Sequence, residues 1–278
     1  MMRKASLKAL LLATAMAAFT GTAALADEAA APAEDEGFPG DFSATFGFYT
    51  NYVFRGVTQT QNDIAFQGSF DWAHSSGLYA GVWASNIEFV PGDDANLEVD
   101  WYGGYNGSID KFSYGIGGIY YMYPDANEPD IDGDGSPNEY DYVEIKGALG
   151  YDFGVAALTG SIYYSPDYFG EIGDTIYYNA AVTIPLPFIP LETTLDGWVG
   201  YQTFLDDWAP FLPVTAALYD DYIDWSVGLS VMLEGFKLGF RYTDTDIDAT
   251  DQTTPPFGYV VDPDFADESF IFSVSRTF

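Results

Sequence analysis

Leu97–Met122 reads LEVDWYGGYNGSIDKFSYGIGGIYYM, and this stretch decides the fold. Apolar residues take every second position from Leu97 to Tyr105, and the carboxylates Glu98 and Asp100 lie between them. After the turn sequence GSID the alternation resumes and continues to the end of the stretch. A period of two indicates extended strands, because successive side chains point to opposite sides. Two such strands around a turn predict an antiparallel hairpin. Each strand is about ten residues long, which suits a tilted crossing of a bilayer.

The N-terminal segment has the pattern of a secretory signal peptide. Arg3, Lys4 and Lys8 precede the apolar run Ala9–Ala18, and an A-x-A cleavage site follows at Ala24–Ala26. The apolar run is too short to span a membrane as a helix. We therefore expect a signal peptide at 1–26, a flexible acidic Ala/Pro leader at 27–40 and a β-barrel domain at 41–278.

Composition excludes several classes of protein. Three of the nine basic residues lie in the signal peptide, so the remainder carries six basic and 42 acidic residues, a net charge of −36. A nucleic-acid partner requires basic surface and is therefore excluded. Cysteine is absent, which excludes disulfides and thiol chemistry. Aromatic residues make up 18% of the chain, as expected for a membrane barrel with aromatic girdles.

The alternating pattern recurs along the whole chain and predicts twelve strands. The connections alternate in length, with short turns after the even-numbered strands and mostly longer loops after the odd-numbered ones. Bacterial outer-membrane barrels have short periplasmic turns and long extracellular loops. We therefore predict an all-β fold, a closed antiparallel transmembrane β-barrel of twelve strands. The strands are expected at about 41–54, 63–73 and 78–86, at the two strands of 97–122, and at about 140–152, 155–165, 175–184, 191–202, 222–233, 236–243 and 268–278.

The chain ends in FIFSVSRTF, with Phe270, Phe272, Val274 and Phe278 on one face of the last strand. This ending is similar to the terminal signal by which outer-membrane proteins are handed to the barrel assembly machinery. Arg276 interrupts the apolar face, and we expect it to extend toward the membrane interface, where an arginine costs little.

Thr50–Phe89, TNYVFRGVTQTQNDIAFQGSFDWAHSSGLYAGVWASNIEF, followed by LEVDWYGGYNG, resembles the TorF-type porin family of proteobacterial outer-membrane proteins. The resemblance is strongest over the first four strands and extends to the closing SVSRTF. It implies an outer-membrane barrel that forms a pore for a solute that is not established, and it implies no catalytic residues.

The inward face of the barrel is the first candidate site. If the aromatic faces contact lipid, the polar positions line the lumen, where carboxylates outnumber bases. A ring of acids in a narrow pore favours cations. Twelve strands leave room for a narrow pore or for none, because charged pairs can also fill such a barrel. The residues predicted to line the pore are Arg55 at the mouth of the first strand, Asp71, Asp100, Glu144, Lys146 and Arg241.

A second candidate is the loop sequence DIDGDGSPNEYD at Asp130–Asp141, which fits the D-x-D-x-D-G pattern of a calcium loop. It departs from that pattern at Pro137 and in ending on an aspartate, and no helices flank it. The alternative interpretation is a solvated acidic loop that divalent cations neutralise at the lipopolysaccharide surface. Ca²⁺ is the only cofactor that the sequence offers, with the possible ligands Asp130, Asp132, Asp134, Ser136, Asn138 and Asp141.

Enzymatic chemistry is not expected. Barrel hydrolases need a base, usually histidine, beside a nucleophile or an activated water. The chain has one histidine, His74, in a predicted periplasmic turn. The many carboxylates form no pair that stands out from the rest.

The sequence therefore predicts an integral protein of the bacterial outer membrane, exported by its signal peptide. Its predicted function is that of a narrow porin that passes small solutes by diffusion and favours cations. The alternative is a non-conducting structural barrel whose acidic extracellular loops bind divalent cations or envelope components. The expected partners are outer-membrane lipid and lipopolysaccharide, the barrel assembly machinery, and small solutes or ions.

Overall fold

The computed structural model describes residues 39–89, 94–124, 126–128, 136–137, 139–189, 191–205, 221–247 and 264–278. The predicted signal peptide at 1–26 and the leader as far as residue 38 lie outside the described residues. Among the described residues, no helix is long and apolar enough to cross a membrane.

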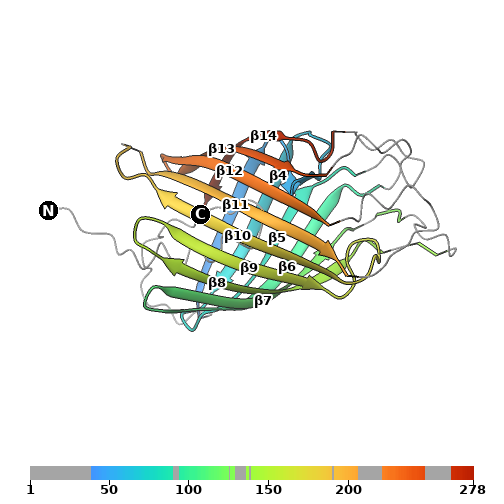
Figure 1. The fold of residues 1–278 in the computed structure, drawn as a ribbon, viewed down its shortest axis with the longest axis horizontal. Coiled ribbons are helices and arrows are strands. Elements are labelled where there is room, and N and C mark those ends of the chain that lie inside the picture. The colour runs from blue at the N-terminus through green and yellow to red at the C-terminus, as the bar shows by residue number, and fades with distance from the viewer. Residues whose placement is uncertain are drawn as a thin grey trace.

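Twelve strands of the described chain close into one antiparallel barrel, which confirms the predicted fold class (Figure 1). Each strand pairs with its neighbours in the chain, and the first strand closes the barrel against the last. The barrel strands are β1 (Asp41–Tyr49), β4 (Ala65–Ala73), β5 (Leu78–Asn86), β6 (Leu97–Ile109), β7 (Phe112–Met122), β8 (Tyr142–Asp152), β9 (Ala157–Ser165), β10 (Thr175–Pro185), β11 (Thr193–Phe204), β12 (Tyr222–Leu233), β13 (Phe236–Thr245) and β14 (Ser269–Thr277).

At the closing seam, the start of β1 lies beside the end of β14, at the same end of the barrel. Phe48 of β1 pairs with Phe66 of β4 on one side and with Val274 of β14 on the other. Ala44 and Phe278 exchange backbone hydrogen bonds of 3.2 and 2.9 Å. The even number of strands therefore returns the chain to the side from which it started.

Short turns connect the strands at one end of the barrel and longer segments connect them at the other (Figure 1). Ile109 pairs with Phe112, so that hairpin turns on residues 110–111, later than the turn expected at 107–110. Asp110 adopts a φ of +56°, as a tight hairpin turn with the twist of the strands requires. The predicted alternation of short and long connections is thus present in the fold.

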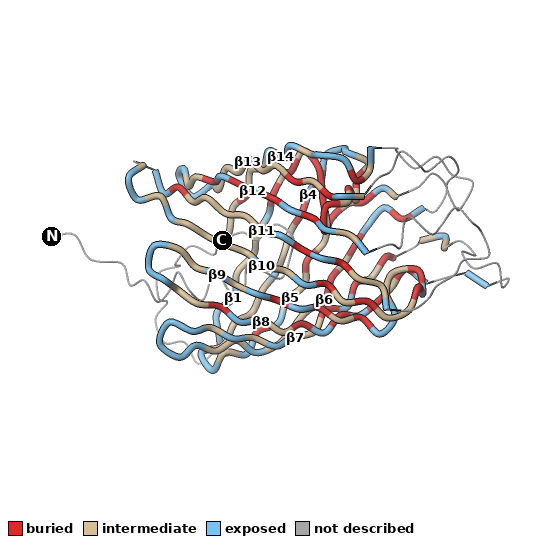
Figure 2. The backbone as a smooth tube through the Cα atoms, in the orientation of Figure 1, coloured by how far each residue is buried: buried red, intermediate tan, exposed pale blue. Residues whose placement is uncertain are grey.

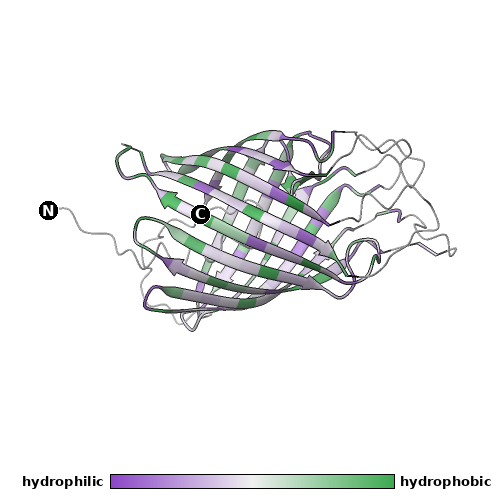
Figure 3. Cartoon of the chain, viewed as in Figure 1, coloured by the Kyte–Doolittle hydropathy of each residue, from purple (hydrophilic) through white to green (hydrophobic). Residues whose placement is uncertain are grey.

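The two faces of the wall differ as the alternation predicts (Figures 2 and 3). Phe46, Ile116 and Leu149 are 59%, 63% and 71% exposed on the outer face. Glu144 and Lys146, on the opposite face of β8, are buried in the interior. An apolar exterior around a closed hydrogen-bonded wall is the arrangement that lipid demands, because no backbone group is left unpaired in hydrocarbon.

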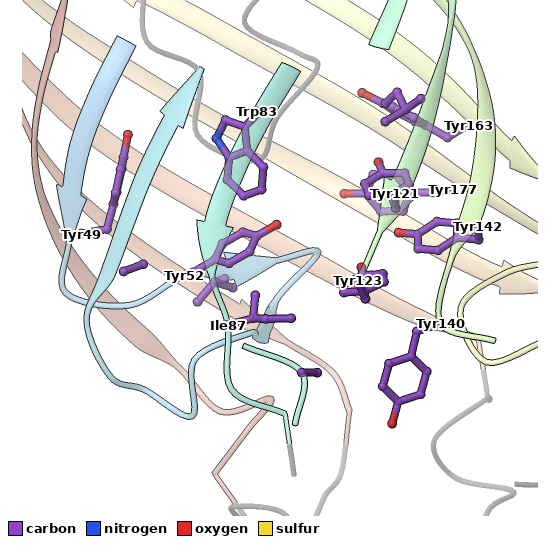
Figure 4. Close-up of a cluster of buried hydrophobic side chains, with 14 of the residues drawn as sticks. Tyr49, Tyr52, Trp83, Ile87, Tyr121, Tyr123, Tyr140, Tyr142, Tyr163 and Tyr177 are labelled. Carbon is purple, nitrogen blue, oxygen red and sulfur yellow. The ribbon is translucent and has the colours of Figure 1, made fainter. Parts of the chain in front are cut away.

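The interior toward the loop end is packed with aromatic side chains, most of them tyrosines (Figure 4). Tyr121 and Tyr142 stack with ring centroids 4.3 Å apart, and Tyr52 contacts Trp83 edge-on at 5.3 Å. Each ring has an apolar body and a polar hydroxyl, so tyrosine can fill a lumen and still satisfy its polar neighbours. The barrel is therefore filled rather than empty at this level.

The prediction for the first strand is wrong beyond Tyr49. The alternating sequence continues to Phe54, but the chain leaves the wall after Tyr49, and its next segment folds into the barrel. Tyr52, which the pattern placed toward lipid, is 5% exposed in the interior. A period of two distinguishes a strand from a helix. It does not distinguish a strand of the barrel wall from a hairpin that folds inside the barrel.

Candidate functional site: a hairpin inside the barrel

A small hairpin made of β2 (Val53–Phe54) and β3 (Val57–Thr58) lies between β1 and β4 in the chain. Phe54 pairs with Val57, so Arg55 and Gly56 form its tip. Both have positive φ, +49° and +83°, which matches the two-residue turns that tight hairpins prefer. This backbone geometry presents the Arg55 side chain at the end of the hairpin.

Asn51 fixes the base of the hairpin. Its amide nitrogen donates to the side chains of Asn62 and Ser269 at 2.8 and 3.0 Å. Its carbonyl oxygen accepts from the hydroxyls of Thr58 and Thr60 at 2.6 and 3.2 Å. These bonds join the start of the hairpin to its end and to β14, so the hairpin is held as a unit against the wall.

Arg55 reaches across the interior to the opposite wall. Its Nη2 lies 2.7 Å from both carboxylate oxygens of Glu144 on β8, and its Nη1 donates to Oε1 of Gln202 on β11 at 2.8 Å. The arginine and glutamate side chains are 5% and 1% exposed. A buried pair of this kind is stable only when both partners stay in place. Arg55 therefore ties the hairpin to strands on the far side of the barrel.

Aromatic rings surround the guanidinium of Arg55. Its Cζ lies 4.2 Å from the ring centroid of Tyr177 and 4.7 Å from that of Phe54, with Tyr163 and Tyr168 at 5.3 and 5.9 Å. Such contacts favour a cation over the ring faces. Burial raises the pKa of Tyr168, in the β9–β10 loop, to about 12, so its hydroxyl remains protonated at neutral pH.

Carboxylates occupy the wall beside the hairpin. Glu98 and Asp100, both on the inward face of β6, are 2% and 4% exposed. Asp224 accepts hydrogen bonds from the Tyr177 hydroxyl at 2.9 Å and from Trp198 Nε1 at 2.8 Å. The loop-side half of the interior thus concentrates acidic side chains around Arg55.

The turn-side half has a different arrangement. Asp71 on β4 accepts hydrogen bonds from the Tyr102 hydroxyl and, at 2.7 Å, from the Ser69 hydroxyl. Arg241 on β13 forms an ion pair with Asp196 on β11, and its Cζ lies 4.4 Å from the ring centroid of Trp198. Cations and carboxylates are therefore mixed at this end.

The structure places all six residues of the predicted pore lining inside the barrel. Arg55 and Glu144 are brought into direct contact, and Nζ of Lys146 lies 5.2 Å from the ring centroid of Tyr163. Arg55 itself lies inside the lumen rather than at its mouth, because the hairpin folds inward. Whether these residues line an open passage stays a prediction.

Among the polar residues of the interior that sequence reasoning missed are Gln202 and Lys237. Lys237 lies on the same face of β13 as Arg241, four residues earlier, so the period of two was a signal that could have found it. Gln202 lies near the end of β11 at an inward-facing position, so the period of two could have identified it as well. Its contact with Arg55 was not predictable, because the inward fold of the hairpin creates it.

The calcium-loop prediction falls largely on residues outside the described part of the chain. Asp130, Asp132, Asp134 and Asn138 are not described, whereas Ser136 and Asp141 are. The Asp141 carboxylate accepts hydrogen bonds from the Tyr123 N–H at 2.7 Å and from the Tyr120 hydroxyl. Within the described ranges, no group of three or more acidic or histidine side chains is arranged to hold a metal ion. The Ca²⁺ site stays a prediction.

His74 lies in the turn between β4 and β5, as expected. Its Nδ1 is 2.7 Å from the Ser76 hydroxyl, and its ring stacks on Trp72 at 5.9 Å. These contacts stabilise the turn at the end of the barrel opposite the loops.

The model of one protein family matches residues 33–278, which include the whole barrel, and its description is "Bacterial protein of unknown function (Gcw_chp)". The model does not carry the TorF name, so that resemblance stays a prediction. No curated protein matches the sequence.

Two solved structures share the fold. The NanC porin is 11% identical with a TM-score of 0.51, over 86% of this chain and 99% of its own. The KdgM porin is 8% identical with a TM-score of 0.50, over 85% of this chain and 98% of its own. At these identities the likeness concerns the fold, a porin-like barrel of about the same extent.

Proposed function

Because the chain belongs to the bacterial Gcw_chp family, whose function is not known, we propose its function from its own interior: a narrow porin of the bacterial outer membrane. Small solutes pass along the lumen under their own gradient, and the Arg55 hairpin sets the narrowest point. The observation that carries the proposal is a charged hairpin folded into a closed, lipid-facing barrel. The proposed protein provides a passage and carries out no reaction.

The excess of acidic over basic side chains in the interior supports a preference for cations. In the body of the described barrel, the inward carboxylates outnumber the inward cations. Carboxylates that line a narrow path lower the energy of a cation and raise that of an anion. The acids are Asp71, Glu98, Asp100, Glu144, Asp196 and Asp224, and the cations are Arg55, Lys146, Lys237 and Arg241.

One observation favours the alternative, a barrel that does not conduct. Arg55, Glu144 and Gln202 connect opposite walls, and tyrosine rings pack around them. A permanent plug of this kind would leave a structural barrel whose acidic loops bind divalent cations or envelope components at the cell surface. The two functions differ in one measurable property, the conductance of the barrel.

Conductance of the refolded protein in a planar bilayer under a salt gradient tests the proposal. Discrete current steps with a reversal potential that indicates cation selectivity are the expected result. Steps with anion selectivity would keep the pore and overturn the argument from the inward carboxylates. Inserted, folded protein without steps would favour the non-conducting barrel, and calcium titration of residues 124–141 would then test its loops.

A further inference from the structure

A cavity of about 50 Å³ lies inside the turn-side half of the barrel, away from the Arg55 hairpin. The strands β11 to β14 and Tyr49 of β1 form its wall, and it is called here the Lys237 cavity. Gly228 and Gly239 contribute backbone but no side chains to its lining. The residues around it that carry polar groups are Tyr49, Asp196, Ser230, Lys237, Arg241, Ser273 and Ser275.

The cavity combines two cations with one carboxylate. Lys237 lines the cavity together with Asp196 and Arg241. Arg241 donates to Asp196 through Nη2 and to the Ser226 hydroxyl at 2.7 Å through Nη1. Because a guanidinium carries five N–H donors, these two bonds leave further donors on Arg241. With one carboxylate against two cations, the wall carries one net positive charge.

We propose that the Lys237 cavity binds one small oxyanion, the carboxylate or phosphate group of a solute. Lys237 supplies the charge and the hydroxyls of Ser230, Ser273 and Ser275 supply hydrogen bonds. Asp196 holds Arg241 against the wall and offsets one of the two positive charges. This site lies in a barrel whose interior is otherwise rich in carboxylates, so a binding anion has few competing positions.

The size of the cavity fits this ligand. One water-sized group needs roughly 10–15 Å³ of such space, so the cavity accepts about three to five of them. A carboxylate or a phosphate group has about that many heavy atoms, whereas a sugar ring has more. The inference does not depend on conduction, because binding needs access to the cavity from the turn-side end only.

Isothermal titration of the refolded full barrel with inorganic phosphate, at constant ionic strength set with chloride, tests the site. The wild type is expected to bind phosphate saturably at one site. Lys237→Gln is expected to weaken binding roughly tenfold or more, because it removes a charge-assisted hydrogen bond. Lys237→Arg keeps the charge and is expected to retain binding.

Arg276→Gln is the matched control. Arg276 lies at the same end of the barrel but on the outer face, where its Cζ is 5.0 Å from the ring centroid of Phe236 and 5.1 Å from that of Phe278. This variant removes one positive charge from the same region and should leave phosphate affinity unchanged. Equal weakening by Lys237→Gln and Arg276→Gln would overturn the site in favour of general surface charge.

Gly239→Ala tests the cavity without a change of charge and serves if Lys237→Gln does not fold. Its new Cβ would lie 2.5 Å from the Ser273 Oγ, so the added methyl group must displace this hydroxyl, which lines the cavity. Weaker phosphate binding supports the site, and unchanged binding contradicts it. Competition by acetate would assign the site to oxyanions in general, and its absence would assign it to phosphate groups. Absence of saturable binding of either anion to the wild type would overturn the inference, whatever the conductance of the barrel.

Discussion

Arg55 and Glu144 form an ion pair across the inside of the barrel, with Nη2 of the arginine 2.7 Å from both oxygens of the carboxylate. One partner is at the tip of a hairpin that follows β1, and the other is on the inner face of β8. The pair therefore joins the inner hairpin to a wall strand with which it shares no sheet. The pair fixes the position of the hairpin in the lumen, and it therefore also fixes how much of the lumen the hairpin leaves unfilled.

Removal of one partner should destabilise the folded barrel. Arg55→Ala leaves a buried carboxylate without its counter-charge, and we expect a loss of about 3–5 kcal/mol in the free energy of unfolding. Urea unfolding in detergent micelles, followed by tryptophan fluorescence, measures it. Lys111→Ala removes a cation from the exposed β6–β7 turn and should change stability by no more than about 0.5 kcal/mol. A similar small change for Arg55→Ala would show that the pair is not buried in the folded protein.

Gly56 should tolerate alanine less well than Gly154 does. Both have a positive φ, +83° and +86°, so each alanine carries a backbone strain of about 1 kcal/mol. A Cβ at Gly56 would also overlap the methyl group of Thr245, whereas nothing lies within 4 Å of one at Gly154. We expect Gly56→Ala to cost at least about 1 kcal/mol more in the same unfolding assay. Equal costs would mean that the hairpin tip does not contact β13.

The sequence predicts the wall of this barrel better than its interior. Leu78–Asn86 and Tyr222–Leu233 match their predicted bounds, because turn residues bracket an uninterrupted alternation. The sequence TNYVFRG carries the same alternation and yet folds inward. Arg55 and Glu144 are 89 residues apart, and only barrel closure together with the inward hairpin brings them into contact. A single sequence shows which side of a strand is polar, but it does not show which polar residues meet across a lumen.

Ion selectivity should depend on Asp100. Asp100→Asn replaces a carboxyl group on the inner face of β6 with a neutral amide and nearly conserves side-chain volume, so we expect the reversal potential under a salt gradient to move toward zero. Asp110→Asn makes the same change in the exposed β6–β7 turn, where asparagine also tolerates the positive φ of +56°. That variant should keep the wild-type reversal potential. An unchanged potential in Asp100→Asn would remove this residue from the conducting path.

The loop-side ends of β11 and β12 should loosen in acid. Although burial acts in the opposite direction, hydrogen bonds from the Tyr201 hydroxyl at 2.5 Å and the Phe204 N–H at 3.0 Å hold the pKa of Asp221 below its ordinary value. Because the folded state has the lower pKa, the stabilisation is complete above the ordinary carboxyl pKa and is lost as the pH falls through the folded value.

Amide exchange of Phe204, corrected for its intrinsic rate, measures this effect. Its protection should be lower at about pH 3, which is below the ordinary aspartate pKa of about 3.9, than at about pH 6. An amide in the middle of β12, such as that of Gly228, should keep its protection over the same range. Parallel loss at both amides would indicate global unfolding instead of a local effect at Asp221.

Single-channel conductance of the wild type beside Arg55→Ala, with Lys111→Ala as the control, tests most directly whether the hairpin sets the width of the passage. If the Arg55 hairpin narrows the lumen, the wild type and the control should both show small, cation-selective current steps. Arg55→Ala should give larger steps, because the hairpin loses its attachment to Glu144 and Gln202. Steps of equal size in all three proteins would contradict the role of the hairpin, and no current from any of them would contradict the porin.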